Sequence, residues 1–296
     1  MAAFAIEQAV YWSSWKAERE LRTEIQAPDF TPAEEELALY PPFFPSPPLF
    51  HQSSVHVDIQ QRADRSWYFF LSEISIRRLT FSVVKDRLIA ERLGGDNYLH
   101  ILAMKSFQHQ AQAEEWVATL PEIVSISSTP APDDDICRFI LRGKLMDFYE
   151  LVYWPFVEGA LNAQPNIAID GQDSSVKTLQ DLTLSGLQHH VTRIHVNKPG
   201  FRHRHHGTPR LIQSCTRSAL VLIGAKLEMR NLHNDRLHLL TQMPIGWEDA
   251  VLAVVELNEY WAAEFPESFE FLSILRKSWE RLPCLEGGQL STEAQN

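Results

Sequence analysis

Residues 134–162, with the sequence DDICRFILRGKLMDFYELVYWPFVEGALN, decide the fold class of this chain. Apolar residues recur there every three or four positions, which is the spacing of one face of an α-helix. We expect the acids Asp133, Asp134 and Asp135 to cap this helix and complement its dipole, because no further acid follows one turn later to complete a magnesium site. Pro155 lies inside the pattern and is expected to kink or split the helix.

The same helical period runs through most of the remaining chain, and the alternation typical of strands is nearly absent. We predict an all-α fold with an N-terminal helix and a proline-rich wrapping segment in residues 1–60, a single helical body in 61–284 and a polar tail in 285–296. The further helices are predicted at residues 11–26, 67–93, 106–120, 176–196, 209–228, 247–264 and 267–282.

The composition restricts the classes of function. The chain has 296 residues, of which 45% are hydrophobic, and a formal net charge of −11, so it can build a sizeable core but repels a nucleic-acid backbone. We therefore expect no direct nucleic-acid binding. The three cysteines form no CxxC pair, no nucleotide, serine-hydrolase or zincin motif occurs, and no apolar run is long enough to span a membrane. These features predict a cytoplasmic protein without cofactor or metal.

Residues 203–223, HRHHGTPRLIQSCTRSALVLI, place cationic and titratable side chains at the start of an apolar helix. Thr208 is predicted as its N-cap and Pro209 as its first helical residue. The free N–H groups and positive dipole end of such a helix favour an anionic or polar ligand group, with Arg204, His205, His206 and Arg210 as candidate catalytic donors. The alternative is a polar plug between helices whose hydrogen bonds are satisfied. Three histidines within one short loop are poorly placed to share a metal ion.

Several aromatic residues and one acid are candidates for binding an apolar substrate: Trp67, Tyr68, Tyr153, Trp154, Trp261 and Glu150. The aromatic residues may equally be ordinary core, since aromatic side chains dominate cores in general. Glu150 has an alternative role as the partner of a buried Arg217, and Glu73 and Arg77 have the spacing of an ion pair on one helix.

Six short stretches, in collinear order, resemble the regulatory body of fungal zinc-cluster transcription factors. The resemblance covers about residues 11–282 and implies an all-helical fold. The departures are Pro209, where an aromatic residue is expected, and the lack of the six-cysteine zinc cluster that precedes the body in that family. The matching stretches are SWKAERELR (14–22), FPSPP (44–48), SWYFFLSEISIRRL (66–79), ELVYWPF (150–156), HHGT (205–208) and MPIGWEDAV (243–251).

The resemblance suggests two functions from different classes. One is a regulatory body converted to a cofactor-free cyclase, of Diels–Alder type, or to a small-molecule-binding protein of fungal secondary metabolism that takes an apolar terpenoid or polyketide. The other is a transcription regulatory protein without its own DNA-binding module, which acts through a binding partner and would be nuclear. A buried cavity beside the histidines favours the first function, and an exposed apolar patch favours the second.

Overall fold

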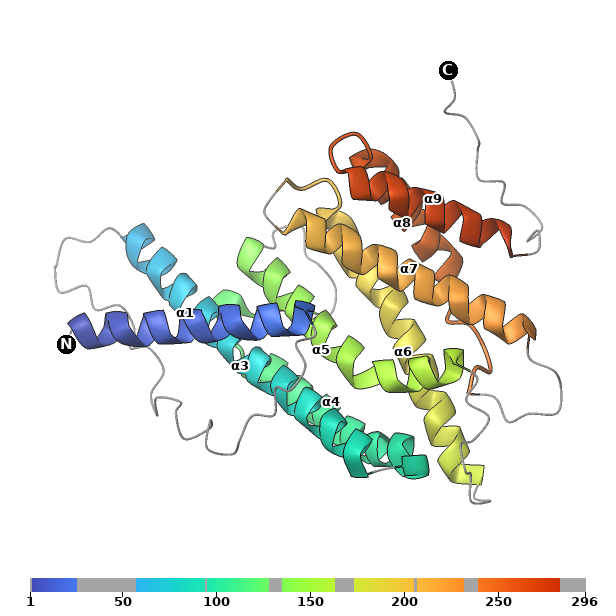
Figure 1. The fold of residues 1–296 in the computed structure, drawn as a ribbon. Helices are drawn as coiled ribbons and strands as arrows, with labels where there is room; N and C mark the ends of the chain where they lie inside the picture. Colours follow the sequence, from blue (N-terminus) through green and yellow to red (C-terminus); the bar gives the residue numbers. More distant parts are fainter. Residues whose placement is uncertain are drawn as a thin grey trace. The chain divides into compact units, whose positions relative to one another are not determined.

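The computed structural model of the chain describes residues 2–25, 57–93, 95–127, 135–162, 173–204, 207–231 and 239–282. These residues contain helices and no strand, so the prediction of an all-α fold is confirmed for this part of the chain (Figure 1). The proline-rich segment and the polar tail lie outside it. The helices are α1 (Ala2–Ile25), α3 (Val57–Leu93), α4 (Tyr98–Thr119), α5 (Ile136–Leu161), α6 (Asp173–Asn197), α7 (Thr208–Asn231), α8 (Trp247–Trp261) and α9 (Pro266–Glu280), with 3₁₀ turns η1 (Gly95–Asn97), η2 (Glu122–Val124) and η3 (Lys198–Gly200).

The chain divides into two compact units. The first comprises Met1–Leu93 and Lys105–Phe148, and the second comprises Gly94–Met104 and Tyr149–Asn296. Helices α4 and α5 therefore contribute one part to each unit, whereas α6 to α9 belong wholly to the second.

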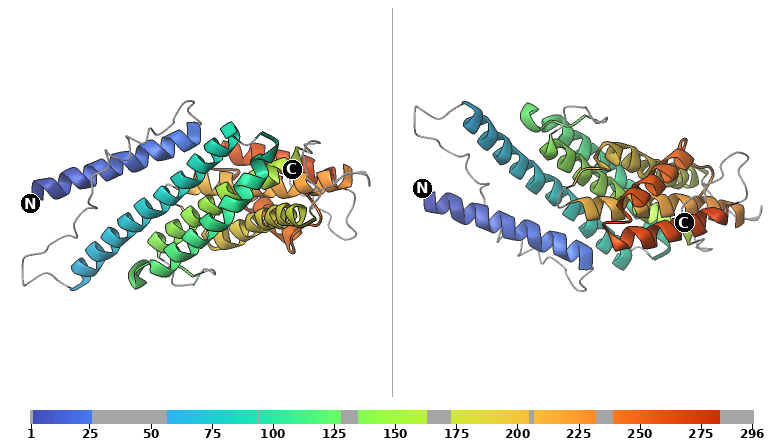
Figure 2. Two further views of the ribbon diagram at one scale, coloured as in Figure 1. Left: turned by 90° about the horizontal axis from the view of Figure 1, so that it is seen from below. Right: turned by 90° about the horizontal axis from the view of Figure 1, so that it is seen from above.

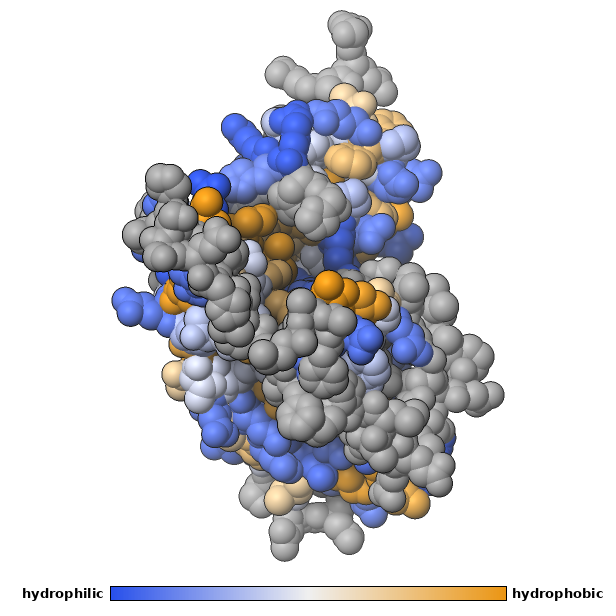
Figure 3. Space-filling model, turned by 90° about the vertical axis from the view of Figure 1, so that its left-hand side faces the viewer, coloured by the Kyte–Doolittle hydropathy of each residue, from blue (hydrophilic) through white to orange (hydrophobic). Residues whose placement is uncertain are grey.

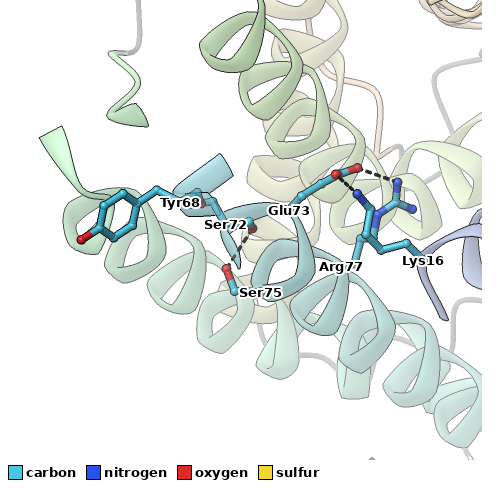
Figure 4. A network of polar contacts seen from close by, with 6 residues as sticks. All are labelled: Lys16, Tyr68, Ser72, Glu73, Ser75 and Arg77. Carbon is cyan, nitrogen blue, oxygen red and sulfur yellow. Dashed lines mark hydrogen bonds and ion pairs between the residues drawn. The ribbon is translucent and has the colours of Figure 1, made fainter. Parts of the chain in front are cut away.

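In the first unit, α1 packs against α3 through aromatic side chains and one polar network. Trp12 and Trp15 are buried with Ile74 of α3. Beside them Glu73 accepts hydrogen bonds from Lys16 of α1 and from Arg77, the latter at 2.9 Å (Figure 4). Burial raises the pKa of the Glu73 carboxyl, but the two cations outweigh this effect, so the pKa is lower than usual. The predicted Glu73–Arg77 pair is confirmed, with Lys16 as an additional partner.

Helices α3 and α4 are joined by polar side chains at two levels. The indole Nε1 of Trp116 donates to Ser75 Oγ at 2.8 Å. At the other level Asp86 Oδ2 lies 3.2 Å from His109 Nε2 and 3.5 Å from Lys105 Nζ. These contacts fix the register between two helices that otherwise bury apolar faces.

Helix α5 begins as predicted, with Asp135 Oδ1 accepting the backbone N–H of Arg138 at 3.0 Å, which is N-cap geometry. Asp133 and Asp134 lie outside the described residues. The expectation that Pro155 splits the helix is wrong, because α5 continues unbroken to Leu161. Pro155 is buried, so packing holds its turn in helical form.

In the second unit, α6 packs against α7 and α8, and α9 covers α7 and α8 (Figures 1 and 2). The largest apolar side chains of these helices are fully buried, among them Leu187, Ile194, Leu222 and Leu275. Helix α8 begins at Gly246, whose φ of 77° requires a glycine. The burial of one apolar face from each helix is the main source of stability of this unit.

The close approach of α5 and α6 depends on Gly186. A Cβ atom at this position would lie 2.5 Å from Val157 Cγ2 and 3.0 Å from Tyr153 Cβ. Only a residue without a side chain fits there, so Gly186 sets the distance between the two helices.

The described surface is largely hydrophilic with scattered apolar side chains. On the face drawn in Figure 3, charged residues separate smaller apolar areas. The most exposed large apolar side chains come from different elements: Ile6, Leu93, Met104, Ile245 and Phe269. Single exposed apolar residues of this kind are normal and do not by themselves mark a binding site.

Candidate functional site

The first polar assembly of the second unit is an ionic cluster of Glu150, Arg193 and Arg217, from α5, α6 and α7. Arg193 Nη2 lies 2.7 Å from Glu150 Oε2, and Arg217 Nη2 donates to the same carboxylate at 2.8 Å. The Arg193 side chain is 2% exposed, whereas the Arg217 side chain is 58% exposed. The ionic cluster therefore ties three helices together inside the unit and reaches solvent through Arg217.

Two further titratable side chains lie in this interior, His190 and Cys215. His190 is almost completely buried, and its Nδ1 is 3.0 Å from Ser218 Oγ. Burial, with the charges of Arg193 and Arg217, lowers the pKa of His190 to about 3. Burial raises the pKa of the Cys215 thiol to about 12. At neutral pH both groups are uncharged, so neither is activated for acid–base or nucleophilic chemistry.

The second assembly is an arginine–aromatic cluster formed by Arg202, Arg204, Tyr260, Trp261 and Glu264. The guanidinium of Arg204 lies 5.0 Å from the Trp261 ring and 5.7 Å from the Tyr260 ring, and that of Arg202 lies 5.4 Å from the Tyr260 ring. Arg204 also donates to Tyr260 Oη at 3.0 Å and to Glu264 Oε1 at 2.5 Å. The cluster joins residues 202–204 to the end of α8 and the turn that follows it.

Trp261 is the buried base of this arginine–aromatic cluster. Its side chain is 1% exposed, and its Nε1 donates to the Phe201 carbonyl at 2.7 Å. Above it the Arg204 side chain is 58% exposed and Tyr260 is 39% exposed. A buried indole thus positions two cations and a phenol at the surface.

The start of α7 differs by one residue from the prediction. Leu211 N donates to the Gly207 carbonyl at 3.0 Å, so Gly207 is the N-cap and Thr208 already belongs to the helix. The hydroxyl of the buried Thr208 donates to the His203 carbonyl at 2.8 Å and does not cap an N–H group. Thr208 therefore fastens the preceding loop, which is why its side chain faces away from the helix end.

The predicted catalytic residues do not assemble at one point among the described residues. Arg204 belongs to the arginine–aromatic cluster, and Arg210 is exposed on the first turn of α7. His205 and His206 lie outside the described residues, so their roles stay predictions. Arg204 and Trp261, predicted as donor and wall, are the one pair of predicted site residues that the structure brings together through a printed ring contact in this part of the chain.

The predicted binding residues are distributed over both units. Trp67 and Tyr68 contact one another on α3 with ring centroids 4.7 Å apart, and Figure 4 shows Tyr68 pointing away from the Glu73 network. Tyr153 stacks on Tyr149 at 6.1 Å and is half-buried, as is Trp154. The suggested contact between Glu150 and Arg217 is confirmed, but the expectation that Arg217 is buried is wrong.

Sequence reasoning missed Arg193 and Tyr260. Glu150 inside an apolar helix was a signal that a buried cation exists, but the choice among several arginines depends on how α5, α6 and α7 pack. Tyr260 follows a regular helical pattern and has no sequence feature that marks it as exposed beside two arginines.

Among the described residues no group of three histidine, cysteine or acidic side chains is arranged to hold a metal ion. No described helix is long and apolar enough to cross a membrane. No protein-family model, curated protein or solved structure matches this chain.

Proposed function

We propose that this chain is a helical regulatory body of transcription that acts by binding a partner protein at the arginine–aromatic cluster. The resemblance of six collinear stretches to the regulatory body of fungal zinc-cluster factors supports the class of function. The observation that carries the proposal is the placement of Arg204 over the buried Trp261, with Tyr260 exposed beside it.

The residue types of this cluster favour a protein interface. Arginine, tyrosine and tryptophan are the side chains most enriched among the residues that dominate binding energy. Arg204 is held by Glu264 and by the two rings before any partner arrives, so little side-chain freedom is lost on binding. Arg202 adds a second exposed cation beside the same Tyr260 ring.

The interior of the second unit supports a binding role over bond-making chemistry. His190 and Cys215 are the buried titratable groups nearest the ionic cluster, and both are neutral at physiological pH. Glu150 is engaged by two arginines. These groups hold helices in place, and the exposed chemistry of the unit lies at its surface.

A tethering experiment tests this function. The full chain is fused to a heterologous DNA-binding domain, and transcription is measured from a reporter that carries the matching operator. A regulatory body changes reporter output relative to the DNA-binding domain alone. Equal output of the fusion and of the isolated domain, at equal protein levels in several growth conditions, would contradict the proposal.

A cofactor-free cyclase is the second candidate, favoured by the position of Arg204 next to α7. A guanidinium 58% exposed above an indole has the donors needed to polarise a carbonyl of a terpenoid or polyketide. Its test is incubation of the purified protein with extracts of a strain that lacks the gene. A new isomer that disappears with Arg204→Ala supports the cyclase, and unchanged chromatograms together with a reporter response exclude it.

A further inference from the structure

The exposed end of the ionic cluster holds an arginine in a fixed position. Arg217 Nη2 lies 2.8 Å from Glu150 Oε1 and donates to Oε2 at the same distance, so one nitrogen of the guanidinium is anchored. The Glu150 side chain is 10% exposed and the Arg217 side chain 58% exposed. A buried carboxylate thus orients a guanidinium whose other nitrogens remain available at the surface, since no contact of theirs appears among the described residues.

The charge at this place also favours an anion. Glu150 carries one negative charge and contacts the guanidinium groups of both Arg193 and Arg217. One carboxylate neutralises at most one of the two cations it contacts. The depressed pKa of His190, to which both arginines contribute, agrees with a positive local potential.

We infer that Arg217, oriented by Glu150, forms a binding site for a small organic anion, separate from the arginine–aromatic cluster. A guanidinium recognises two oxygens of one carboxylate or phosphate group in a fork, and Arg217 has the donors for this fork beyond the nitrogen held by Glu150. Such a site gives the helical body an effector, that is, a small molecule whose binding braces α5 against α7.

Ligand titrations on the full chain test this inference, with benzoate and inorganic phosphate as probes and chloride as the ionic-strength control. Isothermal titration measures affinity, and the ¹⁵N–¹H signal of Arg217 Nε reports contact. The variants are Arg217→Met and Arg276→Met. Arg276 is a matched control because it is also an exposed arginine of the second unit, paired with one glutamate, Glu259, at 2.7 Å.

We expect saturable binding of benzoate, phosphate or both to the wild type, with the Arg217 signal shifting in parallel, and the probe that binds identifies the oxygen group. Arg217→Met should weaken binding about tenfold or more, the factor that corresponds to one lost charge-assisted hydrogen-bond pair, and Arg276→Met should leave it unchanged. Failure of both probes to saturate beyond chloride would overturn the inference, as would equal weakening by the two variants. If Arg217→Met does not fold, Arg217→Lys keeps the charge, loses the fork and should bind more weakly than the wild type.

Because the inference uses Arg217 and Glu150 alone, it does not depend on the proposed regulatory function. A reporter that does not respond, combined with saturable probe binding, rejects regulation and keeps the anion site.

Discussion

Arg193 Nη2 of α6 lies 2.7 Å from Glu150 Oε2 of α5, and the arginine is 2% exposed. A charge this deeply buried is tolerated because a carboxylate accompanies it. The pair therefore makes the second unit sensitive to the loss of either partner.

Glu150→Ala should lower the free energy of unfolding by about 3–5 kcal/mol, because it leaves Arg193 buried without this carboxylate. Urea unfolding followed by circular dichroism measures the change. Glu264→Ala is the control, since it removes the partner of the exposed Arg204 and should cost no more than about 1 kcal/mol. Similar losses in the two variants would show that Glu150 is not a buried counter-ion.

Gly186→Ala should destabilise the protein by about 1–3 kcal/mol, since the new Cβ atom meets Val157 and Tyr153 at overlapping distances. Gly143→Ala on α5 is the matched control. No atom lies within 4 Å of a Cβ placed at Gly143, and alanine favours a helix over glycine by up to about 1 kcal/mol. Thermal unfolding should move in opposite directions for the two variants, and a shift in the same direction would contradict the packing described.

The buried His190 predicts a loss of stability in mild acid. Its pKa is about 3 in the folded chain and about 6.5 when unfolded, so the unfolded state binds the proton first. The stabilisation is complete above pH 6.5 and falls by about 2 kcal/mol between pH 6.5 and 5. His190→Asn should reduce this pH dependence, whereas His195→Asn, at an exposed position, should keep it. Urea midpoints at pH 7.5 and 5.0 provide the measurement, and identical slopes in all three proteins would refute it.

Cys215 should resist alkylation in the native protein. It is fully buried and its pKa is raised to about 12, so little thiolate is present at pH 8. Cys137 is only half-buried and should react faster than Cys215. Mass spectrometry of peptides after timed iodoacetamide treatment distinguishes them. Rapid native labelling of Cys215, comparable to that in urea, would indicate that α7 is not packed as described.

Sequence periodicity predicted the helices well where an apolar face is buried and less well where a helix extends into solvent. Helix α3 begins at Val57, ten residues before the predicted start, because its first turns are polar and carry no apolar period. They are supported by local contacts instead, such as Gln60 Nε2 donating to Asp64 Oδ1 at 2.7 Å. A face that buries nothing leaves no hydrophobic period to detect.

The candidate site was predictable in part. The Glu150–Arg217 contact followed from a lone acid in an apolar helix and a cation on a later one, and Arg204 was identified from its place before α7. The roles of Arg193 and Tyr260 depend on which faces of α6 and α8 meet their neighbours. Such pairings are long-range packing choices, which a single sequence does not encode locally.

The central claim is that the arginine–aromatic cluster is the surface through which this chain regulates transcription. The most direct measurement is reporter output from the tethered full chain carrying Arg202→Ala and Arg204→Ala together. The control carries Arg87→Ala and Arg276→Ala, which remove two exposed arginines, each paired with one glutamate. With equal protein levels and melting temperatures, we predict that the first variant loses most of the reporter response and the control keeps it. Retention of the full response without Arg202 and Arg204, or equal loss in both variants, would contradict the claim.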